Sequence, residues 1–207
     1  MKSKLLFSTQ IYQEKITPKV IALKSLLKEI TIESFQIKKL DAAGRLWSKL
    51  NYPNGYTSYS SLDQVHQMSS TFGELEKLIR IHVAKFLKNL DYNVTVQNLK
   101  MTDCWVNIMS KNTIHTAHLH PKSIISGTFY VLAPKDCSGI KFHDPRTAQF
   151  MNTPQIKSSA KIHNQRFFTL NPKPGDIVLF ESWLMHEVPL NISKEPRISI
   201  SFNYDWK

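Results

Sequence analysis

The residues of this chain that could bind a metal ion are grouped in its C-terminal half. His118 and His120 lie two positions apart, so on an extended chain both side chains project from the same face and can reach one ion. A third ligand is then expected from elsewhere, and His186 is the best candidate. It lies in segment 181–189 directly after the apolar run Trp183-Leu-Met185, where an unpaired imidazole would be costly. Each histidine alone is more readily explained as structural, but together they predict a three-histidine metal site.

Arginine is scarce in this chain, and one arginine closely follows the third histidine. The 27 basic residues include only Arg45, Arg80, Arg146, Arg166 and Arg197. Arg197 comes eleven residues after His186, with Pro189 and Pro196 between them. A hairpin of that length predicts that Arg197 lies nearly opposite His186, about 5–8 Å away on the neighbouring strand. A metal ion and a guanidinium so placed would bind an acid whose far carboxylate meets the arginine.

The segments that carry these residues have the period of β-strands. Beyond residue 92, short runs rich in Val, Ile, Phe, Tyr and Trp are separated by Pro and Gly. These runs predict eight strands, near residues 101–109, 115–120, 124–132, 139–143, 166–170, 176–180, 184–189 and 197–204. Eight short strands favour a closed or two-sheet structure, such as a jelly roll or a cupin-like barrel.

The first hundred residues have a helical period instead. Thr17 and Pro18 predict the start of a helix, because they supply an N-cap and a first-turn proline before apolar residues at helical spacing from Val20 to Ile30. A capping box at residues 71–74 predicts a second helix that ends near Asn89.

The order of these elements predicts an α+β fold. The turn-rich segment 51–60 should be a loop packed through its tyrosines. We expect one domain over residues 1–207, in which residues 1–95 are mainly helical support and residues 96–207 form the β core. The helices should pack on the outside of one sheet of that core.

Two of the predicted strands carry polar residues on one face only. The polar sets are Arg197, Ser199, Ser201 and Asn203 in one strand, and Ser126, Thr128 and Tyr130 in the other. These faces could meet bulk water, while the apolar faces form the core. They could instead line the interior of a barrel that holds a polar ligand. Alternation alone leaves both readings open.

The positive charge of the chain does not by itself indicate a nucleic-acid partner. The formal net charge is +11, but the surplus is mostly lysine scattered through every segment. Nucleic-acid binding would favour clustered arginine and a recognisable module, so we do not expect a nucleic-acid partner. The two cysteines, Cys104 and Cys137, could form at most one bridge, which disfavours a disulfide-stapled scaffold.

The distribution of apolar residues indicates a soluble protein. No run approaches the roughly 18 apolar residues of a membrane span, and the apolar stretch near the N-terminus is limited to Leu5, Leu6 and Phe7. We therefore expect a cytoplasmic protein with no membrane partner. A homodimer is the base-rate expectation for its assembly.

Five stretches of the C-terminal half resemble iron(II)- and 2-oxoglutarate-dependent oxygenases. The closest resemblance is to a small bacterial and phage family of such enzymes, and together the stretches lie within residues 101–204. They are Trp105-Val-Asn-Ile-Met109, residues 115–130 from His115 to Tyr130, Asp144-Pro-Arg146, residues 174–189 from Pro174 to Pro189, and Arg197-Ile-Ser-Ile-Ser-Phe-Asn203. The resemblance is specific for the family and uninformative about the substrate.

The resemblance implies a double-stranded β-helix and a role for several residues. By position, His118 and His186 match the first and distal histidines that hold iron in the superfamily. Arg197 resembles the arginine that binds the 5-carboxylate of 2-oxoglutarate, and Tyr130 resembles a tyrosine that hydrogen-bonds the same group in prolyl hydroxylases. Ser199 could assist Arg197. Asn107 is a weaker candidate for contacting the keto-acid end.

The chain departs from the superfamily at the remaining ligand position. Aspartate or glutamate is usual there, and this chain has His120. Three neutral imidazoles and a dianionic 2-oxoglutarate would still balance the charge of Fe(II). A three-histidine site also resembles cupin-type dioxygenases that use no 2-oxoglutarate. Asp144 is the alternative carboxylate ligand, although the sequence Asp-Pro-Arg fits a turn with an ion pair better.

The resemblance implies an enzyme that hydroxylates a C–H bond. In that reaction O2 and 2-oxoglutarate are consumed, and succinate and CO2 are released, without a separate acid or base residue. Two alternatives remain: a cupin-type dioxygenase without a cosubstrate, and a non-catalytic basic β-sandwich that binds an acidic partner. The substrate is not indicated by any motif. Asp144, Arg146, Trp183 and the loop 52–59 are candidates for the pocket wall.

Overall fold

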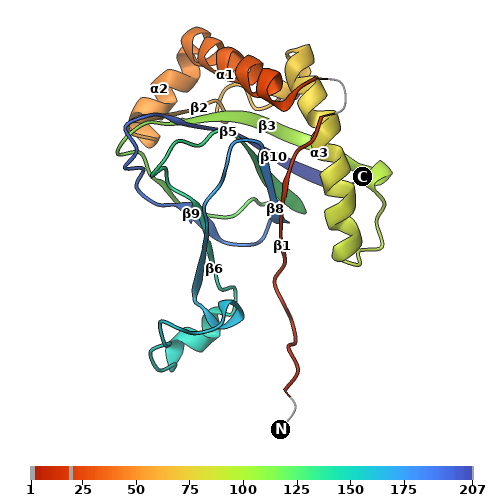
Figure 1. The fold of residues 1–207 in the computed structure, drawn as a ribbon, viewed down its shortest axis with the longest axis vertical. Helices are drawn as coiled ribbons and strands as arrows, with labels where there is room; N and C mark the ends of the chain where they lie inside the picture. The colour runs from red at the N-terminus through yellow and green to blue at the C-terminus, as the bar shows by residue number, and fades with distance from the viewer. Residues whose placement is uncertain (1–2, 19–20, 207) are drawn as a thin grey trace.

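Two antiparallel sheets face each other in the structure, a computed structural model that describes residues 3–18 and 21–206 (Figure 1). The six-stranded sheet has the strand order β1-β8-β5-β10-β3-β2, and the four-stranded sheet has the order β4-β9-β6-β7. The strands are β1 (Ile11–Lys15), β2 (Gly55–Thr57), β3 (Leu99–Met109), β4 (His115–His118), β5 (Ile125–Leu132), β6 (Ile140–His143), β7 (Phe167–Leu170), β8 (Asp176–Glu181), β9 (His186–Val188) and β10 (Arg197–Trp206). The helices are α1 (Leu23–Leu40), α2 (Ala42–Asn51) and α3 (Ser70–Asn89).

All eight predicted strands form, and they alternate between the sheets except that the consecutive strands β6 and β7 pair with each other in one sheet. β3, β5, β8 and β10 belong to the six-stranded sheet, whereas β4, β6, β7 and β9 make up the four-stranded sheet. This alternation produces the jelly-roll architecture that the sequence predicts. Two further strands, β1 and β2, were not predicted and form the edges of the six-stranded sheet.

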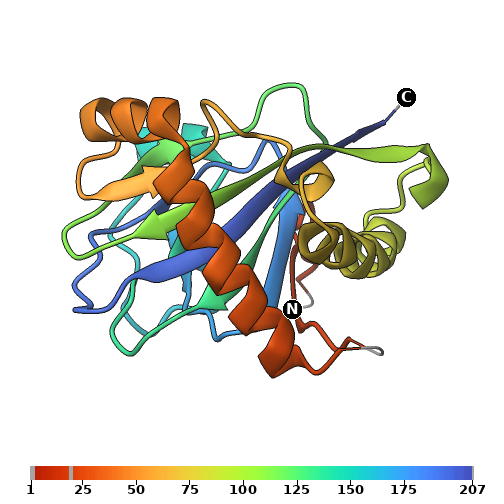
Figure 2. The ribbon, with the colours of Figure 1, turned by 90° about the horizontal axis from the view of Figure 1, so that it is seen from above.

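The helices cover one face of the six-stranded sheet, as Figures 1 and 2 show. The apolar side chains of β10, Ile198, Ile200 and Phe202, are fully buried and belong to the same core cluster as Leu75 and Ile79 of α3. The prediction that helices pack outside one sheet is therefore confirmed. No helix within residues 3–18 and 21–206 has the length and apolar character needed to cross a membrane.

The predicted start of the first helix is wrong. Thr17 lies outside any helix, Val20 lies outside the described residues, and α1 begins at Leu23. The chain before the helix is still attached to the sheet, because the Ile16 N–H donates to the Gly175 carbonyl at 2.9 Å. This extended attachment overrides the local helix signal.

The predicted capping box of the later helix is displaced. α3 begins at Ser70, and Ser69 is the N-cap, whose hydroxyl accepts a hydrogen bond from the Phe72 N–H at 3.3 Å. The box at residues 71–74 therefore lies inside the helix. Ser69 has extended backbone angles, which allow its side chain to bind the free N–H groups of the first turn.

The tyrosine-rich segment contains more structure than predicted. Residue 51 ends α2, and residues 55–57 form β2, which pairs with β3. Tyr52 and Tyr56 are buried, whereas Tyr59 is half exposed. Packing through tyrosines is thus confirmed for two of the three, but a simple loop is not.

Asp41 fixes this segment onto the helices. It is the N-cap of α2, and its carboxylate accepts hydrogen bonds from the Gly44 N–H at 2.8 Å, the Tyr56 hydroxyl at 2.8 Å and the Ser61 hydroxyl at 2.6 Å. The side chain is largely buried. One carboxylate therefore joins the start of α2 to β2 and to the turn that follows.

Replacing Asp41 by alanine should lower the free energy of unfolding by about 2–3 kcal/mol, because it removes a helix cap and leaves the buried Tyr56 hydroxyl without an acceptor. Urea denaturation measures the change. Asp41→Asn keeps one acceptor oxygen and should cost less than Asp41→Ala. Equal stability of Asp41→Ala and the wild type would contradict this role.

Candidate metal centre and adjoining cavity

The polar faces of β5 and β10 point into the space between the sheets. Ser199 of β10 pairs with Asn107 of β3 on one side and Tyr130 of β5 on the other. All three side chains are buried, and they line a cavity to which both sheets contribute. The polar faces therefore line the barrel interior, and the reading in which they meet bulk water is wrong.

Three histidines meet at one side of this cavity. Potential ligand atoms of His118, His120 and His186 all lie within 4.8 Å of one another, with the Nε2 atoms of His120 and His186 at 3.3 Å. His118 and His186 are paired residues of β4 and β9. The structure thus brings together the three residues that the sequence singled out, in a group that could hold one metal ion.

Backbone carbonyls orient two of the imidazoles. His118 Nδ1–H donates to the Thr116 carbonyl at 2.8 Å, and His186 Nδ1–H donates to the Leu184 carbonyl at 2.9 Å. A carbonyl can only accept, so the proton lies on Nδ1 in both rings. The Nε2 lone pairs are left free for a metal, which is the usual arrangement of histidine ligands.

Burial keeps these imidazoles neutral. It lowers the pKa of His186 to about 2, with a further contribution from the adjacent His118. Burial likewise lowers the pKa of His120 to about 4 and lowers the pKa of His118. A metal ion therefore has no proton to displace from these rings at neutral pH.

His120 is held by contacts of a different kind. Its backbone N–H donates to the Ser182 carbonyl at 2.9 Å, and its ring stacks against Trp105 with the ring centroids 5.8 Å apart. A hydrogen bond with Asn203 raises the pKa of His120 against the larger effect of burial. Asn203 in turn accepts from the Ser126 hydroxyl at 2.8 Å. Polar neighbours therefore orient the histidine at the position where the sequence comparison expects a carboxylate.

Arg197 is a buried cation without a counter-ion. Its side chain is 3% exposed, and it forms no ion pair with any residue that the structure describes. Nη1 donates to the Met109 sulfur at 3.0 Å, the guanidinium carbon lies 4.9 Å from the centre of the Tyr130 ring, and Nε has no hydrogen-bond partner. An unpaired buried charge is unfavourable, so the arrangement is suited to an anion.

Other polar atoms around Arg197 also lack partners. The hydroxyls of Tyr52 and Tyr130 and the Oδ1 atom of Asn107 are buried without hydrogen bonds, and all three residues line the same cavity as Arg197. Buried polar groups are normally satisfied, so several open groups around one cavity indicate a polar ligand.

The predicted hairpin between His186 and Arg197 is wrong. β9, which begins at His186, pairs with β4 and β6, whereas β10, which begins at Arg197, pairs with β3 and β5. Residues 189–196 cross from one sheet to the other. The two residues nevertheless line the same cavity, because the sheets face each other across it.

The family of this region is given by its sequence. Residues 103–203 match a family model described as "Putative 2OG-Fe(II) oxygenase". These residues form an oxygenase domain of that family. The domain includes the three clustered histidines and every polar cavity residue described above except Tyr52. No curated protein matches the chain in sequence.

Solved structures of 2-oxoglutarate oxygenases share the fold of the oxygenase domain and its helices. SnoN, a non-heme α-ketoglutarate-dependent epimerase of nogalamycin biosynthesis, is 12% identical with a TM-score of 0.64, over 95% of this chain and 76% of its own. HygX from Streptomyces hygroscopicus, with nickel and 2-oxoglutarate bound, is 12% identical with a TM-score of 0.60, over 96% and 84%. A Pseudomonas putida prolyl-4-hydroxylase is 12% identical with a TM-score of 0.59, over 97% and 94%. These likenesses show the fold, a double-stranded β-helix.

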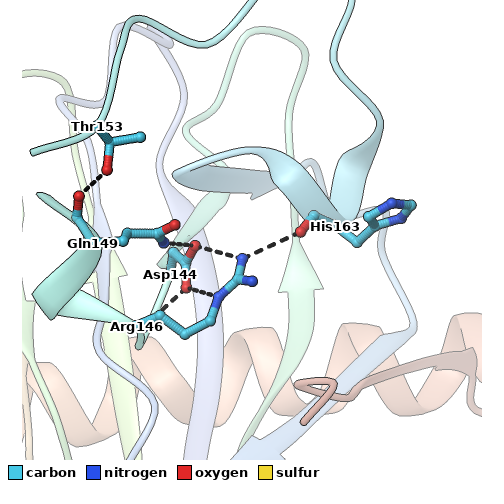
Figure 3. Close-up of polar contacts among 5 residues, drawn as sticks. All are labelled: Asp144, Arg146, Gln149, Thr153 and His163. Atoms are coloured by element: carbon cyan, nitrogen blue, oxygen red, sulfur yellow. Dashed lines mark hydrogen bonds and ion pairs between the residues drawn. The ribbon is translucent and has the colours of Figure 1, made fainter. Parts of the chain in front are cut away.

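Asp144 of the oxygenase domain lies outside the histidine group. Its carboxylate accepts from Arg146 Nε at 3.0 Å and from Arg146 Nη2 at 2.8 Å, as well as from Gln149 (Figure 3). The turn with an ion pair is therefore confirmed, and a ligand role for Asp144 finds no support. Asp144 and Arg146, two of the candidates for the pocket wall, line a separate cleft. Trp183, a further candidate, is half exposed.

Three cavity residues had no predicted role. Trp105 stacks on His120, Met109 contacts Arg197, and His115 stacks on His118 with the ring centroids 4.2 Å apart. Trp105 and Met109 alternate with Asn107 along β3, so the period-2 rule could have placed all three on the inner face. His115 shares the cavity because the pairing register shifts between it and His118.

Proposed function

We propose that this protein is an Fe(II)- and 2-oxoglutarate-dependent oxygenase that hydroxylates a C–H bond and releases succinate and CO2. The observation that carries the proposal is one cavity with two kinds of binding group. Three neutral imidazoles, from His118, His120 and His186, lie together, and the unpaired Arg197 lines the same cavity.

The donor set suits ferrous iron. Imidazole nitrogen is a good ligand for Fe(II), and three neutral rings leave the ion with its full charge. A dianionic 2-oxoglutarate would balance that charge, so the missing carboxylate at position 120 is compatible with this cosubstrate. In this proposal His118, His120 and His186 are the iron ligands.

The remaining cavity residues suit the far end of 2-oxoglutarate. Arg197 and Tyr130 would bind the 5-carboxylate through the guanidinium fork and the open hydroxyl, with Ser199 assisting. Asn107 would donate to the keto-acid end through an N–H of its amide, whose nitrogen also donates to the Ser201 hydroxyl at 3.0 Å. Tyr52 belongs to the loop 52–59, which the sequence analysis named only as a candidate for the pocket wall. It offers a second buried hydroxyl beside Arg197.

Bound iron and 2-oxoglutarate supply the oxidising chemistry by activating O2. The chain itself holds the imidazoles of His118 and His186 in one tautomer, keeps all three imidazoles neutral and excludes water from the cavity. Arg197 and Tyr130 fix the cosubstrate in one orientation. No side chain is proposed as a general acid or base.

The proposal is tested by measuring products with purified protein. With Fe(II), 2-oxoglutarate and O2, we expect succinate and CO2 in equal amounts, and no turnover when either iron or 2-oxoglutarate is omitted. O2 consumption that depends on iron but not on 2-oxoglutarate would instead favour the cupin-type dioxygenase. SnoN is described as an epimerase and SnoK as a carbocyclase, so the product of a true substrate must be analysed to establish hydroxylation.

The third ligand can be tested by restoring the usual carboxylate. His120→Asp should retain iron and 2-oxoglutarate binding, because a carboxylate oxygen is also a good Fe(II) ligand. His120→Ala should weaken iron binding by at least about tenfold, a loss comparable to that of an outer-shell partner or greater. Anaerobic Fe(II) titration of both variants checks this. Unchanged iron affinity in His120→Ala would remove His120 from the ligand set.

Two further expectations remain proposals. A cytoplasmic location and a possible homodimer follow from composition and base rates alone. A non-catalytic basic β-sandwich is the weaker alternative, because it gives no reason for an unpaired arginine inside the barrel. That alternative predicts salt-sensitive binding of an acidic polymer and no bound iron.

A further inference from the structure

A second cleft opens at the end of the barrel, between the N-terminal segment and the connection from β6 to β7. We call residues 144–166 of that connection the insert. The cleft is lined by residues 5–11 on one side and by the insert on the other, with a volume of about 390 Å³, which is in the range of small-molecule sites. Figure 1 shows both segments extending from the same end of the barrel.

The insert is an ordered wall, because hydrogen bonds tie its two halves together. The Asp144 N–H donates to the Arg166 carbonyl at 2.8 Å and closes the base of the insert. Arg146 binds the Asp144 carboxylate and also donates to the His163 carbonyl at 3.3 Å (Figure 3). Gln149 donates to the same carboxylate. Asp144 and Arg146 thus join the first turn of the insert to its last residues.

Large apolar side chains face this cleft without protein cover. Leu6 is 69% exposed, Phe7 is 94% exposed, and Ile162 on the opposite wall is 62% exposed. Exposed apolar groups gathered on two walls of one cleft mark a binding site for an apolar molecule. The inner end is also apolar, through Phe142 and Leu184.

The cleft carries one uncompensated cation. Among the described residues that line it, Asp144 is the only acid, and its carboxylate is paired with Arg146. Arg166 packs over the Phe150 ring and donates to the Thr153 carbonyl at 3.4 Å, but it forms no ion pair with any residue in the described part of the chain, and its Nε is buried without a partner. A guanidinium in an apolar cleft favours a ligand with a carboxylate or similar anionic group.

The inner end of the cleft lies beside the histidine group. The Phe142 ring lines the cleft, and its centroid is 6.1 Å from that of His186. Leu184 also lines the cleft, and its carbonyl orients the same histidine. One layer of side chains therefore separates the cleft from the proposed iron.

We propose that this cleft is a ligand site separate from the histidine cavity, and that its ligand is an elongated apolar molecule with an anionic group. This inference goes beyond the proposed function, because the described lining of the cleft includes Phe142 and Leu184 but none of the three histidines. The apolar body lies between residues 5–11 and the insert, the anionic group meets Arg166, and one end lies toward Phe142.

Calorimetric titration of the full chain with dodecanoate tests the class directly. Dodecyltrimethylammonium has the same apolar chain and the opposite charge, so it should bind at least about tenfold more weakly. Equal affinity for the two amphiphiles, or no binding of dodecanoate, would overturn the proposal. Because this titration uses metal-free protein, its outcome does not depend on iron.

Matched variants on the insert locate the binding. Ile162→Glu and Arg166→Gln change the cleft and should each raise the Kd of dodecanoate about tenfold. Met151→Glu and Lys157→Gln make the same changes at exposed insert positions that do not line the cleft, and should leave the Kd unchanged. Similar losses in both pairs would show a non-specific surface effect and contradict the proposal.

Proximity to the metal centre is measured with Mn(II) in place of iron. Bound Mn(II) should broaden the proton resonances of dodecanoate, whereas Mg(II) should not, and Ile162→Glu should abolish the broadening. Dodecanoate that binds without broadening in Mn(II)-loaded protein would lie away from Phe142 and would overturn the proposal. Failure of Mn(II) to bind would instead count against the three-histidine centre, while the titrations still decide the cleft.

Discussion

Arg197→Met is expected to raise the Kd of 2-oxoglutarate about 100-fold while leaving Fe(II) binding intact. Removing one partner of a buried charge pair costs about 3 kcal/mol, and each 1.4 kcal/mol is about a factor of ten. The metal ligands lie on β4, β9 and the segment after β4, so the loss should be confined to the cosubstrate. Titration of iron-loaded protein with 2-oxoglutarate under anaerobic conditions measures it.

The free protein provides the control for Arg197. Because the guanidinium is buried without a counter-ion, a methionine of similar length should not lower the free energy of unfolding of the ligand-free chain. Arg197→Lys keeps the positive charge but loses the paired N–H groups of the guanidinium, so it should recover only part of the affinity for 2-oxoglutarate. A large loss of stability with unchanged cosubstrate binding would make Arg197 a structural residue. Unchanged turnover would favour a dioxygenase that needs no cosubstrate.

His186→Ala is expected to weaken Fe(II) binding by more than about 100-fold. Loss of an outer-shell partner alone costs 10-fold to 100-fold in metal affinity, and loss of a ligand should cost more. Anaerobic Fe(II) titration with a competing chelator measures the affinity. His163→Ala removes an exposed histidine of the insert and should leave it unchanged. Equal iron affinity in both variants would place the metal elsewhere or exclude it.

Much of the barrel could be predicted because its strands obey two independent patterns. The eight strands combine β-branched and aromatic residues with turn residues at their ends, and each forms within two residues of its expected position. The alternation around Arg197 and Tyr130 also predicted which side chains share a face. The histidines gave the reason to expect that face inside the barrel.

The hairpin between His186 and Arg197 could not be judged from the sequence. Residues 189–196 have the length and prolines of a turn within one sheet, but the same length also spans the gap between two facing sheets. Local chemistry does not distinguish these paths, because the choice depends on which strands are already paired. The shared cavity was therefore predicted for a wrong topological reason.

α2 escaped prediction because its pattern is inverted. Its buried residues are Gly44 and Ser48, whereas Leu46 and Leu50 are largely exposed. A reading that seeks apolar residues on the buried face finds no helix there. β1 is similarly hidden, since it is a polar edge strand, with Gln13, Glu14 and Lys15 among its five residues, and it pairs with β8 alone.

The positive charge of the chain now has a more specific meaning. Most of it is scattered lysine, but two of the five arginines lie in binding clefts without an acidic partner. Arg197 is assigned to the cosubstrate, and Arg166 to the anionic group of a ligand in the second cleft. The single-domain organisation and the absence of a nucleic-acid partner stay predictions.

The charge-transfer absorption of the iron–cosubstrate complex tests the central claim most directly. Anaerobic addition of Fe(II) and then 2-oxoglutarate to the wild-type chain should produce a visible metal-to-ligand band. The band should be absent in His186→Ala and should need far more 2-oxoglutarate in Arg197→Met. Wild-type protein that binds iron yet shows no band with saturating 2-oxoglutarate would contradict the account.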